Sequence, residues 1–209
     1  MISNSVVQLR FKASNMATTV NICAFLLVFL FNFSQSKVLN LSCEQIKAFV
    51  DGHNNRRYEV ASGDVPNQPA ASEMKMMIWD KELAVKAAKW ASKNKLETNP
   101  DRTLKSNRFT TGENLSKWVS SNMDYELDIK KVLNSWFDEH KNYTYGPLKD
   151  SDSNTYTQMV WSDSTYIGCG VSKDVKENSV EFYVVCYYGP SGNYLNETPY
   201  KAGTPSYDL

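Results

Sequence analysis

The chain has 209 residues, with 23 Lys and Arg balanced by 23 Asp and Glu, and 42% of its residues are hydrophobic. This length and composition fit one ordinary globular domain or two very small ones and exclude a disordered chain. The basic residues form no long run. The sequence therefore also argues against nucleic-acid binding, which needs clustered Lys and Arg to neutralise phosphates.

The N-terminus has the pattern of a secretory signal peptide. Arg10 and Lys12 precede a wholly apolar run at 22–31, and the small residues Ser34 and Ser36 are placed for cleavage after Ser36. The run is too short for a membrane span, which needs about 20 apolar residues. We therefore predict a secreted, extracellular protein with no membrane span.

Cleavage at this point divides the chain into a signal peptide, residues 1–36, and a mature chain, residues 37–209. Met16 lies just before the apolar run and is an alternative start of the protein. The mature chain shows no repeat, low-complexity segment or domain boundary, so we predict a single domain with a short C-terminal tail.

The cysteines are odd in number after this cleavage, because Cys23 is lost and Cys43, Cys169 and Cys186 remain. In an oxidising compartment one pair is expected to form a disulfide. The third thiol then stays unpaired or bridges to another molecule.

Four N-x-S/T sequons follow the predicted cleavage point, at Asn40, Asn114, Asn142 and Asn196. Only sequons on accessible loops can be glycosylated. Asn40 and Asn196 lie near the mature termini and are the better candidates, and Asn142 is a third.

Two helices are predicted in the first half of the mature chain. Residues 43–57 carry one apolar stripe at helical spacing, and His53 lies on it. Residues 61–71 contain Gly and Pro and are predicted to form a connection. Residues 81–93 follow Asp80, an expected N-cap, and are rich in Ala, which favours close helix packing.

The second half is predicted to contain a loop, a helix and a β-hairpin. Residues 94–112 are polar and aperiodic, hence loop, whereas an apolar stripe predicts a helix over 129–140. Residues 166–172 and 180–188 are short, β-branched and aromatic, and the second run alternates as a half-buried strand should. Pairing these strands brings two cysteines together, so the expected disulfide is Cys169–Cys186, which leaves Cys43 over.

Seven sequence blocks in order resemble the CAP superfamily, which comprises cysteine-rich secretory, antigen 5 and pathogenesis-related proteins. They are GHNNRR at 52–57, WDKELAVKAAKWA from 79, GENL at 112–115, SWFDEHKNY at 135–143, YTQMVW at 156–161, IGCGVS at 167–172 and VVCYYGPSGN at 184–193. The GDVPNQPAA pattern at 63–71 resembles the arthropod venom allergen 5 branch. This resemblance implies an α+β fold, a three-layer α-β-α sandwich with a twisted antiparallel sheet. It also implies a helical YTQMVW, where local propensity alone favours a strand.

Many CAP proteins have a cleft lined by two His and two Glu, whose imidazoles can hold a divalent metal. The resemblance assigns the cleft carboxylates to Glu113 and Glu139. One family histidine position, directly before YTQ, is Thr155 here, and the other corresponds to Thr98 or Asn99. Because none of these side chains can replace an imidazole, we expect no metal and no cofactor.

The two histidines of the chain fall elsewhere. His53 is interpreted as a hydrogen-bonded, partly buried helix residue, and His140 is turned about 100° from Glu139 on a helix. A Ser nucleophile would therefore lack a base in the cleft. A paired-carboxylate hydrolase using Glu113 and Glu139 is the least favoured hypothesis, and we interpret both groups as hydrogen-bonding residues at the sheet–helix junction.

The sequence thus predicts a secreted, non-enzymatic venom allergen 5-like protein. The favoured hypothesis is a salivary or venom effector that binds a host protein or another extracellular macromolecule through its loops. The alternative is a carrier of a small lipid, a sterol or fatty acid, in an apolar groove between helices. Trp118, Tyr125 and Trp136 are available for such a groove, although core packing explains them equally well.

Venom allergen 5 proteins generally contain more cysteines than this chain, so its loops should be less tightly tied. Cys43 has no partner in view and leaves three alternatives: a free thiol, a bridge to a small thiol, or a disulfide-linked dimer. We expect a monomer.

Overall fold

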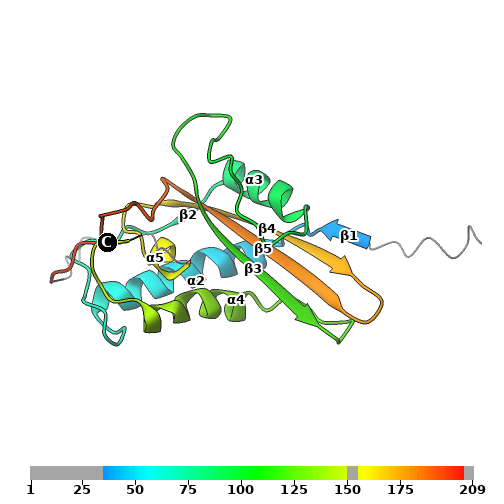
Figure 1. The fold of residues 1–209 in the computed structure, drawn as a ribbon, viewed down its shortest axis with the longest axis horizontal. Coiled ribbons are helices and arrows are strands. Elements are labelled where there is room, and N and C mark those ends of the chain that lie inside the picture. The colour runs from blue at the N-terminus through cyan, green and yellow to red at the C-terminus, as the bar shows by residue number, and fades with distance from the viewer. Residues whose placement is uncertain (1–34, 150–154, 205–209) are drawn as a thin grey trace, which may run out of the picture. The chain divides into compact units, whose positions relative to one another are not determined.

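A central sheet lies between helices in the computed structural model, which describes residues 35–149 and 155–204 (Figure 1). Its elements in chain order are β1 (Gln35–Val38), α2 (Cys43–Ser62), β2 (Ile78–Trp79), α3 (Lys81–Ala91), β3 (Gly112–Ser120), α4 (Ile129–Phe137), the 3-10 helix η1 (Asp138–Asn142), α5 (Thr155–Met159), β4 (Tyr166–Val175) and β5 (Val180–Gly189). Within the described residues, five strands form one sheet in the order β1-β4-β5-β3, with β2 pairing off this path with β4. The predicted signal peptide lies almost entirely outside the described residues.

Helices cover both faces of this sheet (Figure 1). On one face, α3 packs Leu83, Ala87 and Ala91 against Val185 and Tyr187 of β5. On the other face, α2, α4 and α5 share a larger core with the opposite side of the strands. The predicted three-layer α-β-α sandwich is therefore confirmed.

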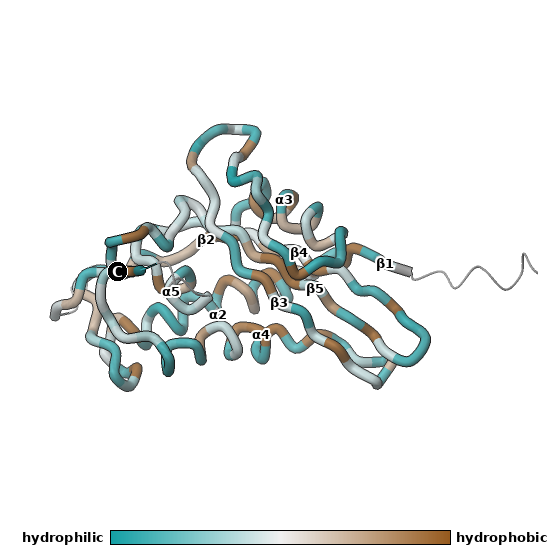
Figure 2. The backbone as a smooth tube through the Cα atoms, viewed as in Figure 1, coloured by the Kyte–Doolittle hydropathy of each residue, from teal (hydrophilic) through white to brown (hydrophobic). Residues whose placement is uncertain are grey.

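Strand β5 is more buried than the sequence predicts. Its two sets of alternating residues point to opposite faces of the sheet, and both faces are covered. Figure 2 shows hydrophobic residues along β4 and β5, which form the centre of the sheet. The expected half-buried strand is wrong because the sequence pattern does not reveal the second helical layer over Val185 and Tyr187.

The β4–β5 hairpin is longer than predicted. Strand β4 continues to Val175, and the turn is closed by a hydrogen bond from Lys176 N to the Ser179 carbonyl, 2.9 Å long. Cys169 lies directly opposite Cys186 in the register, and the two form a disulfide. The two central strands are thus linked covalently as well as by their hydrogen bonds.

Strands β1, β2 and β3 have no counterpart in the sequence predictions. Strand β3 pairs antiparallel with β5 along its whole length, but its polar side chains obscure the alternation. Strand β2 pairs parallel with β4, so the sheet is mostly rather than wholly antiparallel. Strand β1 spans the predicted cleavage point, which would leave only Lys37 and Val38 to pair with β4.

Helix α3 begins after Asp80, the expected capping residue, and the helices differ from the predictions in where they end. Helix α2 begins after Ser42 and continues five residues beyond the predicted Arg57 to Ser62. It is followed by the capping residue Gly63, whose left-handed φ of 77° suits glycine. The side chain of Asp80 accepts the Leu83 N–H at the start of α3. The third predicted helix ends as an α-helix at Phe137 and continues as η1.

Close contact between α3 and the sheet depends on the glycines of the IGCG block. A Cβ at Gly168 would lie 2.2 Å from Ala84 N, and one at Gly170 would lie 2.2 Å from Ala88 N. These neighbours are helix backbone and cannot move aside as a flexible side chain would. The Ala-rich face of α3 and the glycines of β4 therefore fit each other.

Candidate functional site

His53 is the centre of a buried hydrogen-bond chain across the fold. Its Nδ1 lies 2.8 Å from the Phe49 carbonyl, which can only accept, so Nδ1 carries the proton. Its Nε2 then accepts from the Tyr188 hydroxyl at 2.9 Å. The Asn114 amide donates to that hydroxyl at 3.0 Å and to the Thr155 carbonyl at 2.9 Å. This chain joins α2, β5, β3 and α5.

Burial, more than any other influence, lowers the pKa of His53 to about 3. The imidazole is therefore neutral at physiological pH, and both ring nitrogens are engaged. Complete burial goes beyond the partial burial predicted from the sequence and follows from the packing of its ring near Trp136 and Tyr188. His53 is not available to a ligand.

Arg57 is a second buried group of the same helix. Its guanidinium donates to the carbonyls of Lys75, Met159, Trp161 and Ser162 at distances from 2.5 to 3.0 Å. Burial lowers its pKa to about 9, so it remains charged at neutral pH. It ties α2 to the segment before β2 and to the end of α5.

Glu113, the first cleft carboxylate assigned by resemblance, has a fully buried side chain. Its Oε1 accepts the Asn99 backbone N–H at 3.0 Å and lies 3.8 Å from an Arg102 guanidinium nitrogen. The Asn99 amide in turn donates to the Tyr187 hydroxyl at 2.9 Å. Burial and a hydrogen bond with Glu113 raise the pKa of Tyr187. Glu113 thus holds loop 97–103 against the sheet.

Glu139, the second cleft carboxylate, lies in η1. Its Oε2 accepts the backbone N–H of Thr155 at 2.7 Å, at the start of α5. The Thr155 hydroxyl donates to the Trp136 carbonyl at 3.3 Å. A carboxylate at a helix N-terminus is also favoured by the helix dipole. Glu113 and Glu139 therefore each accept a hydrogen bond from a backbone N–H of this chain.

The residues that the resemblance assigns to a cleft do not fit a metal ion. Thr98 is exposed, and neither it nor Thr155 offers an imidazole. His140 is buried against Phe137 and Tyr156, with Nδ1 2.8 Å from the Phe137 carbonyl. Among the residues that the structure describes, no three His, Cys, Asp or Glu side chains gather as a metal site would require.

The other predicted site residues lie at the surface. Cys43 is exposed at the start of α2 and is a free thiol within the described part of the chain. Asn40, Asn142 and Asn196 are exposed, whereas Asn114 is 1% exposed and hydrogen-bonded in the core. The segment before α5, residues 150–154, lies outside the described residues.

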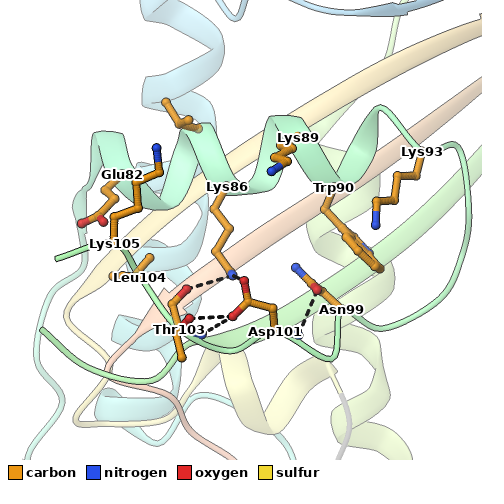
Figure 3. A pocket seen from close by; sticks show the side chains of 11 residues that line it. Glu82, Lys86, Lys89, Trp90, Lys93, Asn99, Asp101, Thr103, Leu104 and Lys105 are labelled. Carbon is orange, nitrogen blue, oxygen red and sulfur yellow. Dashed lines mark hydrogen bonds and ion pairs between the residues drawn. The ribbon is translucent and has the colours of Figure 1, made fainter. Parts of the chain in front are cut away.

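A groove between α3 and the loop 99–105 has no counterpart in the sequence predictions (Figure 3). We call it the α3 groove. Its volume is about 470 Å³, and it is lined by Glu82, Val85, Lys86, Lys89, Trp90, Lys93, Asn99, Asp101, Thr103, Leu104 and Lys105. The sequence contains one signal for it, because Lys86, Lys89 and Lys93 recur at helical spacing.

A second, smaller groove lies beside β4 and β5 on the opposite face from α3. It has a volume of about 260 Å³, and its lining includes Leu39, Leu41, Tyr125, Leu127 and Phe182. Trp136, a candidate from the sequence for an apolar groove, is instead buried and donates its indole N–H to the Leu115 carbonyl. No helix among the described residues has the length and apolar character needed to cross a membrane.

This sandwich, with its disulfide-linked hairpin, is of the class found in cysteine-rich secretory proteins. A model of the cysteine-rich secretory protein (CAP) family matches residues 50–188, and the chain belongs to this family.

Relatives at the sequence level come from animal venoms and from mammals. Scoloptoxin SSD976 of Scolopendra dehaani is 36% identical over 182 residues, covering 82% of this chain and 81% of the relative. Venom allergen 5 of Polistes fuscatus is 34% identical over 166 residues, covering 75% and 79% of the two chains. Cysteine-rich secretory protein 2 of Cavia porcellus is 38% identical over 162 residues and matches over 75% of this chain and 61% of its own length.

Solved structures agree with this assignment. The crystal structure of NaASP2 with Zn2+ has a TM-score of 0.63 and 28% identity, covering 78% of this chain and 88% of the other. Venom allergen-like protein 4 of Schistosoma mansoni has a TM-score of 0.61 and 26% identity, covering 78% and 97%. The sequence-based assignment to the CAP family is confirmed.

Proposed function

We propose that this protein is a secreted, non-enzymatic CAP protein that acts as a salivary or venom effector by binding a host protein or another extracellular macromolecule. The observation that carries this proposal is the state of the cleft. Glu113 and Glu139 each accept a backbone N–H, and His140, which follows Glu139 in the chain, packs against Phe137 and Tyr156. The names of the relatives, a scoloptoxin and venom allergens, point to the same role.

The cleft of this chain is also proposed to bind no zinc. One relative, NaASP2, was crystallised with Zn2+. Zinc sites in proteins use Cys, His and carboxylate ligands, and the family histidine positions here are occupied by Thr155 and by Thr98 or Asn99. The function proposed here therefore depends on surface recognition and not on metal chemistry.

The alternative is a carrier of a sterol or fatty acid, for which the smaller groove is the candidate. Its lining includes apolar residues that a lipid could contact but also Gln45, Glu126 and Lys173, and its volume of about 260 Å³ is small. Pockets that enclose small molecules usually occupy about 300–1,000 Å³. This difference favours macromolecular recognition over lipid transport.

Native mass spectrometry tests these alternatives. We would express the full chain in eukaryotic cells, collect the secreted protein and remove its glycans before the measurement. A monomer that begins at Lys37 and carries no added mass supports the proposal. An adduct with the mass of a fatty acid or sterol, removed by organic solvent, supports the carrier, and a stoichiometric zinc ion contradicts the proposed cleft.

A further inference from the structure

We infer that the α3 groove binds a sulfated polysaccharide, whose anionic groups are held by Lys89, Lys93 and Lys105. This inference rests on the proposed function, because it names the class of extracellular macromolecule that the protein would recognise. It concerns a surface on the α3 side of the sheet, whose lining includes Asn99 but neither Glu113 nor Glu139.

The basic side chains come from both walls of the groove. Lys86 and Lys89 lie on α3, Lys93 lies in the turn that follows it, and Lys105 comes from the facing loop (Figure 3). Positive charges at several points along one wall and on the facing loop suit a chain of anionic groups better than a single anion.

Two acidic residues line the groove, but both are already engaged. Glu82 accepts hydrogen bonds from Ser106 and Arg108. Asp101 accepts from the backbone and hydroxyl of Thr103, and its carboxylate lies 3.3 Å from the Lys86 ammonium. Lys86 also donates to the Thr103 carbonyl. It therefore serves to fix the loop against the helix.

The remaining three lysines have no carboxylate within ion-pair distance among residues 35–149 and 155–204. Lys89, Lys93 and Lys105 are all exposed and face a groove about 470 Å³ in volume. The concentration of unpaired positive charge in a concave site attracts polyanions and orders their anionic groups. The balanced net charge of the chain conceals this local excess.

Trp90 holds the part of the groove next to Lys93 in a fixed position. Its indole N–H donates to the Glu97 carbonyl at 2.8 Å, which fixes the ring. The Lys93 ammonium lies 3.7 Å from the centre of that ring, so a cation–π contact holds this ammonium in place. A lysine positioned before binding loses less conformational entropy when the ligand arrives.

These features favour a polysaccharide over other polyanions. Proteins that bind single-stranded nucleic acid stack successive bases on several aromatic rings, whereas Trp90 is the one aromatic residue that lines the groove. A bilayer surface is flat and cannot follow a recess between a helix and a loop. A flexible, highly sulfated chain fits both the recess and the spread of lysines.

Binding of a heparin-derived oligosaccharide to the full secreted chain tests the inference. In the groove variant, Lys89→Ser, Lys93→Ser and Lys105→Ser are combined. We expect affinity to fall about tenfold or more, because charge-assisted contacts are lost. By counterion release, the slope of log K against log salt concentration should become shallower by about 2 to 3.

The matched control combines Lys47→Ser, Lys130→Ser and Lys201→Ser, which changes the net charge equally at exposed positions away from the α3 groove. This control should keep wild-type affinity, and Lys→Arg substitutions at the three groove positions should restore binding. Equal loss in both variants, or no binding by the wild type, would overturn the inference. So would equal binding of inorganic sulfate at matched charge, or groove-dependent binding to phosphatidylserine vesicles without binding to heparin.

The failure of this inference is distinct from failure of the proposed function. A lipid retained in native mass spectrometry would contradict the binding role without affecting the heparin measurement. Absence of heparin binding in a ligand-free monomer would overturn the groove inference alone.

Discussion

The Tyr188 hydroxyl lies 2.9 Å from His53 Nε2, so the central strand of the sheet is hydrogen-bonded to the middle of helix α2. The two residues are 135 positions apart in the chain. This contact explains why the GHNNRR block contains a histidine that has no part in a cleft. The protonation state of His53 therefore affects the contact between α2 and β5.

Stability should therefore depend on the protonation of His53. Its pKa is lowered from 6.5 to about 3 in the folded protein, so the unfolded chain binds a proton that the folded chain rejects. The contribution to stability is complete above pH 6.5 and is lost as the pH falls toward 3. Between these values, the slope should approach about 1.4 kcal/mol per pH unit. Urea unfolding at a series of pH values measures it.

The His53→Gln variant is the control for this slope. It should be less stable than the wild type at pH 7 by about 1–3 kcal/mol, since a glutamine amide cannot reproduce the imidazole geometry that bonds both the Phe49 carbonyl and the Tyr188 hydroxyl. Between pH 6.5 and 4.5, its stability should vary less steeply with pH. An unchanged slope in His53→Gln would show that another group is responsible.

The packing of α3 on the sheet gives a second prediction. Gly168→Ala and Gly170→Ala each place a Cβ 2.2 Å from a backbone nitrogen of α3. Overpacking of this kind costs about 1–3 kcal/mol. Thermal and urea unfolding should show both variants destabilised, with the helix displaced from the sheet.

Gly146→Ala is the matched control, because nothing lies within 4 Å of the added Cβ. It should leave the unfolding free energy nearly unchanged. Equal stability of Gly146→Ala and Gly170→Ala would contradict the close approach of α3 to β4.

The helices were predictable from the sequence because their signals are local. Asp80 and Ser42 cap α3 and α2 through residues three positions away. Strand β3 was not predictable in this way, since polar residues such as Glu113 and Asn114 interrupt its pattern and are satisfied by distant partners. The helical form of α5 followed from the family resemblance and not from propensity.

The candidate sites show the same division. Glu113 and Glu139 were assigned to a cleft from short motifs that resemble the family, and this assignment stays a prediction. The α3 groove was not predicted, because it exists only when a loop that carries Asp101 and Lys105 folds back over α3 and the turn after it. Helical spacing of lysines usually indicates a solvated face, and only the fold shows that this face is concave.

The role of Glu139 can be tested through α5. Glu139→Ala removes the acceptor of the Thr155 N–H at the start of that helix. We expect a loss of about 1–3 kcal/mol in the free energy of unfolding, because the hydrogen bond involves a charged acceptor. Glu177→Ala, at an exposed turn position, is the control and should be close to neutral. Equal stability of the two variants would contradict a structural role for Glu139.

The Cys169–Cys186 disulfide should contribute more to the free energy of unfolding than the free thiol of Cys43. Cys169 and Cys186 close a loop with a sequence separation of 17. By chain entropy, a loop of about 15 residues is worth about 3 kcal/mol. The double variant Cys169→Ser, Cys186→Ser should lose about that much in urea unfolding, whereas Cys43→Ser should lose little because Cys43 is exposed.

The state of Cys43 is read in the same samples. We expect one thiol of the folded protein to react with a maleimide. On a gel without reductant, the protein should run as a monomer. A dimer that disappears in Cys43→Ser would instead show an intermolecular bridge.

Glycosylation should follow exposure and not the sequon itself. Asn40, Asn142 and Asn196 are exposed, whereas Asn114 is buried and donates two hydrogen bonds from its amide. In protein secreted from eukaryotic cells, glycosidase-sensitive mass should fall in Asn→Gln variants at the three exposed sites. Asn114→Gln should leave that mass unchanged in whatever protein is secreted and should reduce stability, because the longer amide cannot keep both bonds. A glycan found on Asn114 would mean that β3 and the buried chain from His53 to Thr155 are not formed when the sequon is modified.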